Sequence, residues 1–170
     1  MKRRRITVIS LLLILAMTMT SFAAGSITKK EALKKALKSA KTTKSAVKHL
    51  DIELEKGAYE IEFTKRSNGN EYEFKIAKSN GRILEKSVDY TYKKPTSSKK
   101  VGKTKARKTA AKKAGVKYSK IKNCYCDYDV DDDTGIASYD VEFRSGHYKY
   151  DIEVLAATGK VIEYDKKYVK

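Results

Sequence analysis

Histidine is scarce in this chain: its 170 residues contain only His49 and His147. A hydrolase needs a nucleophile beside a base that a third group holds in place. The chain also lacks a Gly-rich phosphate loop, an HExxH pattern and a GxSxG pattern. Both histidines fall in turn-like contexts, where we expect solvated loop residues. We therefore predict that the protein is not an enzyme and needs no cofactor.

Tryptophan is absent, and proline occurs once. With 41% hydrophobic and 35% charged residues, the composition excludes a disordered or membrane-embedded chain and favours one or two small globular units. Cysteine is absent near the end of the leading hydrophobic run, which excludes lipid attachment there.

That leading run spans Ile6 to Met17. Basic residues 2–5 precede it, and the small residues Ser21 and Ala23 follow it. This layout predicts a secretory signal peptide over residues 1–23, cleaved after Ala23. An uncleaved membrane anchor is the alternative, but the apolar core is too short, and too interrupted by Thr and Ser, to span a bilayer. We expect a secreted or cell-wall-associated protein without a transmembrane segment after cleavage.

Acidic residues are absent from residues 93–123, which carry 13 basic side chains. Residues 26–92 hold 15 basic and 10 acidic groups, and residues 124–170 hold 6 basic and 11 acidic groups. The charge is therefore strongly polarised along the chain. Clustered like charges usually have an external partner or a neutralising neighbour within the same molecule.

The chain contains the same pattern twice. At an offset of 74, Ala32, Ala36 and Ala40 align with Ala106, Ala110 and Ala114. At an offset of 80, "YEIEF" from Tyr59 aligns with "YDVEF" from Tyr139, and at 78 "YEFKI" aligns with "YDIEV". The offset changes only in turn-like stretches, where insertions are tolerated. We interpret this as a tandem repeat.

Each copy predicts one helix followed by strands. "TKKEALKKALKSAK" has one apolar stripe with helical period, and Thr28 with Glu31 forms a capping-box pattern. Gly115 is suited to stop the second helix. Strictly alternating segments follow, and a last segment around residues 81–92 is expected to be an edge strand. The fold class is α+β: two tandem repeats, each one N-terminal helix packed on a four-stranded antiparallel β-meander.

These residues resemble a known family. A helix, then "Y-x-[IV]-x-F", then "Y-x-[FI]-x-[IV]" and a turn ending "NGRIL" or "TGKVI", is similar to the PepSY module. The first copy departs from the usual ending because Asn80 replaces Thr. We expect module 1 at residues 26–92, a linker at 93–103 and module 2 at 104–168. The resemblance implies a secreted or envelope protein that binds or restrains peptidases.

Two cysteines, Cys124 and Cys126, lie two apart on a predicted strand, so both side chains share one face. Three interpretations remain open. They are small core residues, a strained and redox-labile disulfide, or half of a metal site, since two thiols supply only two of four tetrahedral ligands.

The segment "DYDVDDDTG" is a candidate for a calcium-binding loop. Asp129, Asp131 and Asp133 alternate there and are weak metal candidates. An EF-hand loop starting at Asp127 would need Gly where Asp132 stands and Glu where Ser138 stands. A solvated hairpin is the favoured interpretation, and no metal site is predicted.

On the second helix, Lys105, Arg107, Lys108, Lys112 and Lys113 are candidates for binding a polyanion. Either the acidic strands of module 2 neutralise them, or they bind wall polymers rich in phosphate or anionic lipid headgroups. Nucleic acid is not expected, because export removes the opportunity and no recognition motif is present.

Two functions follow. The leading hypothesis is a non-catalytic PepSY protein of the bacterial cell envelope that binds another protein and inhibits or regulates a peptidase. Its edge strand would accept the partner by strand addition. The alternative is a basic, wall- or surface-associated structural protein that binds anionic polymers.

Overall fold

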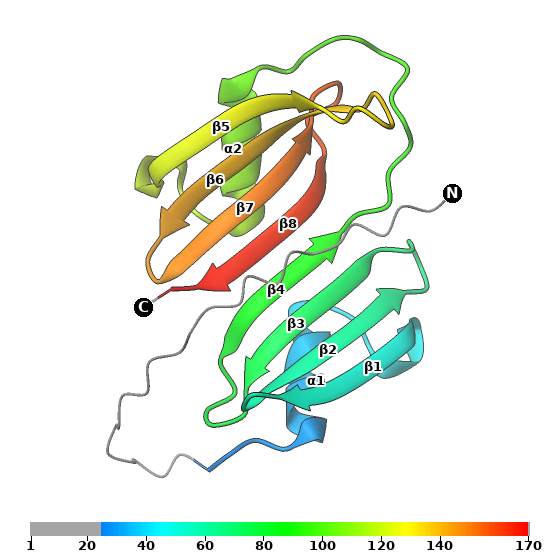
Figure 1. The fold of residues 1–170 in the computed structure, drawn as a ribbon, viewed down its shortest axis with the longest axis vertical. Helices are drawn as coiled ribbons and strands as arrows, with labels where there is room; N and C mark the ends of the chain where they lie inside the picture. Colours follow the sequence, from blue (N-terminus) through cyan, green and yellow to red (C-terminus); the bar gives the residue numbers. More distant parts are fainter. Residues whose placement is uncertain (1–24, 170) are drawn as a thin grey trace.

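The structure, a computed structural model, describes residues 25–169. The predicted signal peptide, residues 1–23, lies outside the described residues. Two helix-plus-meander units follow one another, here called unit 1 and unit 2 (Figure 1). The elements of unit 1 are α1 Lys29–Ser39, β1 Val47–Glu55, β2 Ala58–Lys65, β3 Glu71–Ala77 and β4 Ile83–Asp89. The elements of unit 2 are α2 Lys103–Ala114, β5 Lys122–Val130, β6 Ala137–Ser145, β7 Tyr148–Leu155 and β8 Val161–Tyr168. Short 3₁₀ turns at Lys44–Ala46 and Tyr118–Lys120 precede β1 and β5.

The predicted α+β class and the two repeats are confirmed. The helices begin and end close to the predicted residues because the capping and terminating residues adopt the conformations expected of them. Thr28 and Glu31 form the reciprocal capping box of α1, and Gly115 ends α2 in a left-handed conformation. Before each helix the chain is held by one matched backbone bond, Ile27 N–H to the Lys78 carbonyl in unit 1 and Val101 N–H to the Ala156 carbonyl in unit 2.

The two meanders form one continuous sheet of eight strands in the order β1-β2-β3-β4-β8-β7-β6-β5. The expectation that the segment at 81–92 is an edge strand is wrong, because β4 pairs antiparallel with β8 along residues 85–89. The outermost strands are β1 and β5. We call the β4–β8 pairing the seam. Pairing these strands satisfies backbone groups that two separate units would leave open at their edges.

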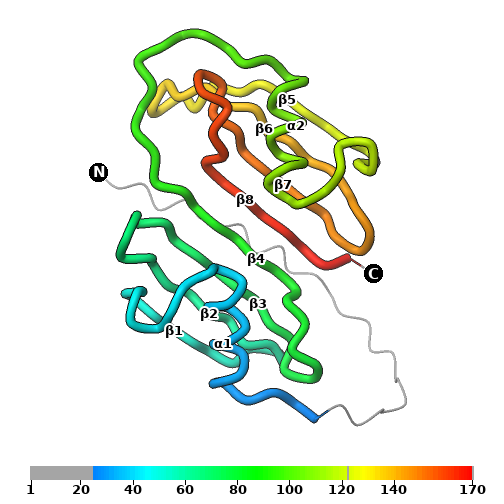
Figure 2. The backbone as a smooth tube through the Cα atoms, turned by 180° about the vertical axis from the view of Figure 1, so that it is seen from behind, coloured from blue at the N-terminus to red at the C-terminus, as the bar shows by residue number. Residues whose placement is uncertain are grey.

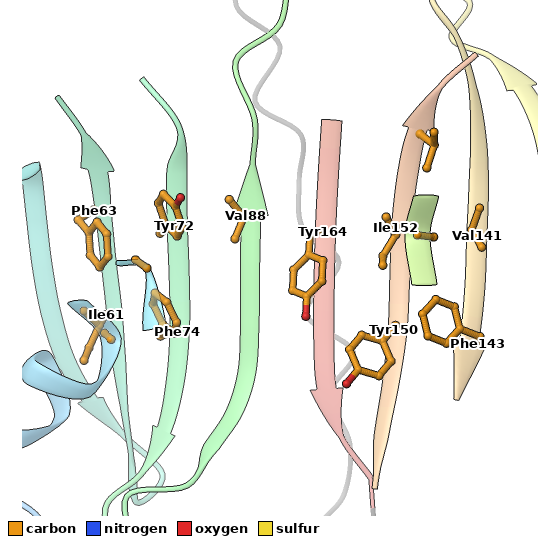
Figure 3. Packing of buried hydrophobic residues seen from close by; sticks show 14 of the residues in the cluster. Ile61, Phe63, Tyr72, Phe74, Val88, Val141, Phe143, Tyr150, Ile152 and Tyr164 are labelled. Carbon is orange, nitrogen blue, oxygen red and sulfur yellow. The ribbon is translucent and has the colours of Figure 1, made fainter. Parts of the chain in front are cut away.

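Both helices cover the same face of the sheet, and β4 and β8 lie between them (Figure 2). We call this the helix face and the opposite side the open face. On the helix face the core is made of matched residues from the two copies. Ile61, Phe74, Val141 and Ile152 are fully buried. Figure 3 shows these side chains together with Val88 and Tyr164, which join the two halves of the core at the seam.

The alanines of the repeat allow the helices to approach the sheet closely. Ala32 and Ala36 in α1, and Ala106 and Ala110 in α2, have no exposed surface. Small side chains at a helix–sheet contact let large strand residues fill the space between the two layers. The amphipathic pattern of the repeat therefore positions both helices on one side of the sheet, and no other helix of residues 25–169 covers the opposite side.

Candidate binding surfaces

The open face is defined by strand alternation. Because Ile61 and Phe74 point into the core, their neighbours Glu60, Glu62 and Glu73 point to the opposite side. The same alternation applies to all eight strands through their registers. Every aspartate and glutamate of the strands lies on the open face: Asp51, Glu53, Glu55, Glu60, Glu62, Glu71, Glu73, Glu85, Asp89, Asp127, Asp129, Asp140, Glu142, Asp151, Glu153, Glu163 and Asp165.

These carboxylates are arranged in rows that cross the seam. Cross-strand partners give one row through all eight strands: Asp51, Glu62, Glu73, Ser87, Asp165, Asp151, Glu142 and Tyr125. The seam therefore does not interrupt the surface. The acidic rows were not predicted, although period-two alternation with Asp or Glu at many outward positions was a signal that could have identified them.

Lysines on the open face neutralise part of this charge. Within the part of the chain that the structure describes, the ion pairs there include Lys75 with Glu60, Lys149 with Glu142, and Lys167 with Glu85. Since these pairs are partly exposed, each stabilises the fold only weakly. The carboxylates remain in excess, so the open face is strongly acidic.

Partial burial and the crowding of carboxylates raise the pKa values of several groups on the open face. Partial burial, followed by repulsion from Glu142, raises the pKa of Asp151 to about 6. Burial and neighbouring carboxylates also raise the pKa of Glu73 and Asp140. A hollow of about 220 Å³ lies among five of these groups, Asp140, Asp151, Glu153, Glu163 and Asp165. Each such group favours a neutral or cation-paired state.

The predicted polyanion residues lie on α2, on the other side of the molecule. Lys105, Lys108, Lys112 and Lys113 are exposed, whereas Arg107 is half-buried and its Nε has no hydrogen-bond partner within the described residues. The acidic strands of module 2 were one predicted source of neutralisation for these basic residues. Their effect is limited, because the strand carboxylates point away from α2. Lys103 does reach one of them, with its Nζ 3.1 Å from Asp127 Oδ1.

Cys124 and Cys126 are free thiols on β5. Cys126 is buried under the start of α2 and Cys124 is half-buried. Burial raises the pKa of both thiols, and the charge of nearby Arg107 opposes this effect. A raised pKa leaves little thiolate, so both are poor nucleophiles and poor metal ligands at neutral pH.

The aspartate loop is held together by its own hydrogen bonds. Asp131 Oδ1 accepts bonds from the backbone N–H of Asp133, and from both the backbone N–H and the hydroxyl of Thr134. Asp129 lies exposed near the end of β5. Within residues 25–169, no group of three or more His, Cys, Asp or Glu side chains is arranged to hold a metal ion.

The histidines are far apart in the fold. His147 lies in the β6–β7 turn, as predicted, with its ring 5.9 Å from the Tyr168 ring. His49 was expected in a loop but lies within β1, where its positive φ of 51° marks a bulge. Asn123 occupies the matching position of β5 with φ 50°. The extra residue of a bulge explains why alternation failed to place His49.

No helix among the described residues has both the length and the hydropathy to cross a membrane.

Residues 26–86 match the model of a family described as "Peptidase propeptide and YPEB domain", PepSY. No curated protein matches the chain. Among solved structures, the chain is similar to the YpeB C-terminal domain of Bacillus megaterium, at 10% identity over 84% of this chain and 98% of that one, with a TM-score of 0.29. It is also similar to a BLIP-like protein from Bacteroides fragilis, at 16% identity over 84% of this chain and 89% of that one, with a TM-score of 0.28.

Proposed function

Since residues 26–86 form a PepSY domain and unit 2 repeats its architecture, we propose that this chain is a non-catalytic protein of the bacterial cell envelope that binds another protein. The partner sits on the open face. The observation that carries this proposal is the open face of one eight-stranded sheet, which no helix among residues 25–169 covers and on which all strand carboxylates are collected.

The size of the open face suits a protein partner. Eight strands at about 4.8 Å spacing and about 24 Å length present about 900 Å². Stable interfaces bury about 800 Å² on each partner. A neighbouring protein that covers this face can therefore bind without rearrangement of the fold.

The charge of the open face selects the partner's chemistry. A partner surface rich in Lys and Arg would offset the carboxylate repulsion that, after burial, raises the pKa of Asp151 and Glu73. Complementary charge also speeds association and makes it sensitive to salt. A secreted peptidase with a basic surface is the partner class to test first, and the consequence of binding is inhibition or regulation of that peptidase.

The test uses the chain beginning at Ala24 and a variant with two reversed charges, Glu73→Lys with Asp151→Lys. Both substitutions remove crowded carboxylates, so the fold should tolerate them. Proteins of the producing cell's culture fluid are captured on each form and identified, and peptidase activity of the fluid is measured with each form added.

We expect the native chain, but not the reversed variant, to retain one basic protein and to lower peptidase activity. A control with two reversed helix-face charges, Lys105→Glu with Lys108→Glu, should behave like the native chain. Equal capture by the native chain and the open-face variant would contradict the proposal.

A second candidate function is attachment to anionic polymers through α2. The exposed lysines Lys105, Lys108 and Lys112 favour it, because the strand carboxylates lie on the other side of the sheet. Release of the protein from isolated cell walls by salt, and loss of attachment in the Lys105→Glu/Lys108→Glu variant, would support it.

A further inference from the structure

Two lysines face each other at the centre of the molecule. Lys86 on β4 and Lys166 on β8 are direct cross-strand partners in the seam. Both point to the helix face, as do the core residues Val88 and Tyr164 two positions away on the same strands. Like charges directly opposite each other in an antiparallel pair destabilise a sheet. We therefore expect another interaction to offset the repulsion between these two lysines.

A third lysine reaches the seam from α2. Lys113 Nζ lies 4.0 Å from the ring centre of Tyr90, the residue that follows β4. Lys166 Nζ lies 3.8 Å from the ring centre of Tyr148. Lys86 Nζ donates to the Ser39 carbonyl and hydroxyl at the end of α1, both at 3.2 Å. We call Lys86, Lys113 and Lys166 the seam lysines.

The helix face supplies no strand carboxylate to these lysines, because all strand carboxylates lie on the open face. Within residues 25–169, Lys113 and Lys166 make ring contacts and no ion pair. An aromatic ring covers one side of an ammonium group and offsets part of its charge. The remaining N–H donors of Lys113 and Lys166 are open to an external acceptor.

The electrostatics agree with this geometry. Burial lowers the pKa of Lys86 to about 8, and the charges of Lys113, Lys166, Lys41 and Lys65 add to the effect. Burial also lowers the pKa of Lys113 and Lys166. A bound anion would reverse these shifts, since an opposite charge favours the ammonium form.

We propose that the seam lysines form a binding site for a phosphate group between the two helices. The ammonium groups of Lys113 on α2 and Lys166 on β8 lie close enough to Lys86 on β4 to act on it electrostatically. Three such groups suit a tetrahedral anion with several acceptor oxygens. A planar carboxylate is more often bound by the fork of an arginine. This site lies on the side opposite the proposed protein-binding face and does not depend on it.

The phosphate can be a free ion or a lipid headgroup. The experiment measures the melting temperature of the chain beginning at Ala24 with inorganic phosphate, against chloride at equal ionic strength. A second arm measures sedimentation of the protein with vesicles of phosphatidylglycerol, against phosphatidylcholine. Vesicle binding that requires Lys166 identifies a headgroup as the source, and phosphate stabilisation without vesicle binding identifies the free ion.

The central variant is Lys166→Met, and the matched control is Lys34→Met on the exposed side of α1, which removes the same charge. We expect phosphate to raise the melting temperature of the native chain and of Lys34→Met, and Lys166→Met to lose at least tenfold in phosphate affinity. Without phosphate, Lys166→Met should melt no lower than the native chain, because the repulsion with Lys86 is gone.

Three results would overturn the proposal. The first is the absence of both a phosphate effect on the native chain and vesicle binding that requires Lys166. The second is an equal effect on the native chain and Lys166→Met, which would mean diffuse attraction to the helix face. The third is stronger stabilisation by polyglutamate than by phosphate at equal charge concentration.

Discussion

Lys41 and Gly115 occupy the same position at the ends of the two helices, and both adopt a left-handed backbone, with φ of 50° and 70°. Their hydrogen bonds match as well. The N–H of Lys41 donates to the Lys38 carbonyl, and the N–H of Gly115 donates to the Lys112 carbonyl. Unit 1 therefore places a side chain where glycine is favoured.

The first prediction concerns this position. Lys41→Gly should raise the free energy of unfolding by about 0.5–1 kcal/mol, because glycine removes the left-handed strain at a smaller entropic cost. Gly115→Ala should lower it by about 1 kcal/mol. Urea denaturation measures both changes. Lys41→Ala, which removes the charge and keeps a side chain at positive φ, is the control and should not reproduce the gain.

The second prediction concerns cooperation between the units. Ile61 and Ile152 are fully buried, one in each unit. Ile61→Ala and Ile152→Ala should each lower the free energy of unfolding by about 2–5 kcal/mol. Each variant should unfold in a single transition, because the units share one sheet and one core. Calorimetry that resolves two transitions, with only one shifted by each substitution, would refute this cooperation.

The third prediction concerns pH. In the folded chain the pKa of Asp151 is raised to about 6 from an ordinary value of 3.8. The folded state therefore binds this proton more tightly than the unfolded state, so the contribution of Asp151 to stability rises as pH falls from 7 through 6 towards 4. Asp151→Asn should be more stable than the native chain by about 1 kcal/mol at pH 7, a value reduced for partial exposure.

That advantage should disappear near pH 4, where Asp151 is protonated in the folded chain. Denaturant melts at pH 7, 5.5 and 4 measure the difference. Asp129→Asn, at an exposed position near the end of β5, is the control and should change stability little. An Asp151→Asn difference that stays constant across these pH values would show that the carboxylate is not destabilised by burial and by its neighbours.

The fourth prediction concerns the thiols. Because Cys126 is buried, Cys124 half-buried and both pKa values are raised, an alkylating reagent at pH 7.5 should label Cys124 slowly and Cys126 more slowly still. In denaturant, without reductant, both should be labelled at once. Mass spectrometry counts the labels, and a denatured chain with no label would reveal a disulfide instead.

The alternation of apolar and polar residues along single strands predicted most of the hydrophobic core. "YEIEF" and "YDVEF" place Ile61 and Val141 inward, and both are fully buried. The seam could not be predicted in this way, since pairing of β4 with β8 depends on how the two units meet. Lys86 and Lys166 stand at inward positions where apolar residues are expected, and that mismatch was the signal of their special environment.

The side of the sheet on which the charged side chains lie was the second feature that charge counts alone did not reveal. The run of 13 basic residues in 93–123 was visible in the sequence. Their separation from the strand carboxylates follows only when both helices are placed on one side of the sheet.

The antiparallel seam relates the two units by an approximate twofold rotation. A lone helix-and-meander unit would expose the edge of its last strand and could pair with an identical copy through the same ladder, as closed dimers do. Joining both copies in one polypeptide makes this pairing independent of protein concentration. It also frees each half to acquire substitutions that the other lacks, as Lys86 opposite Lys166, and Gly115 at the position where unit 1 has Lys41, already illustrate.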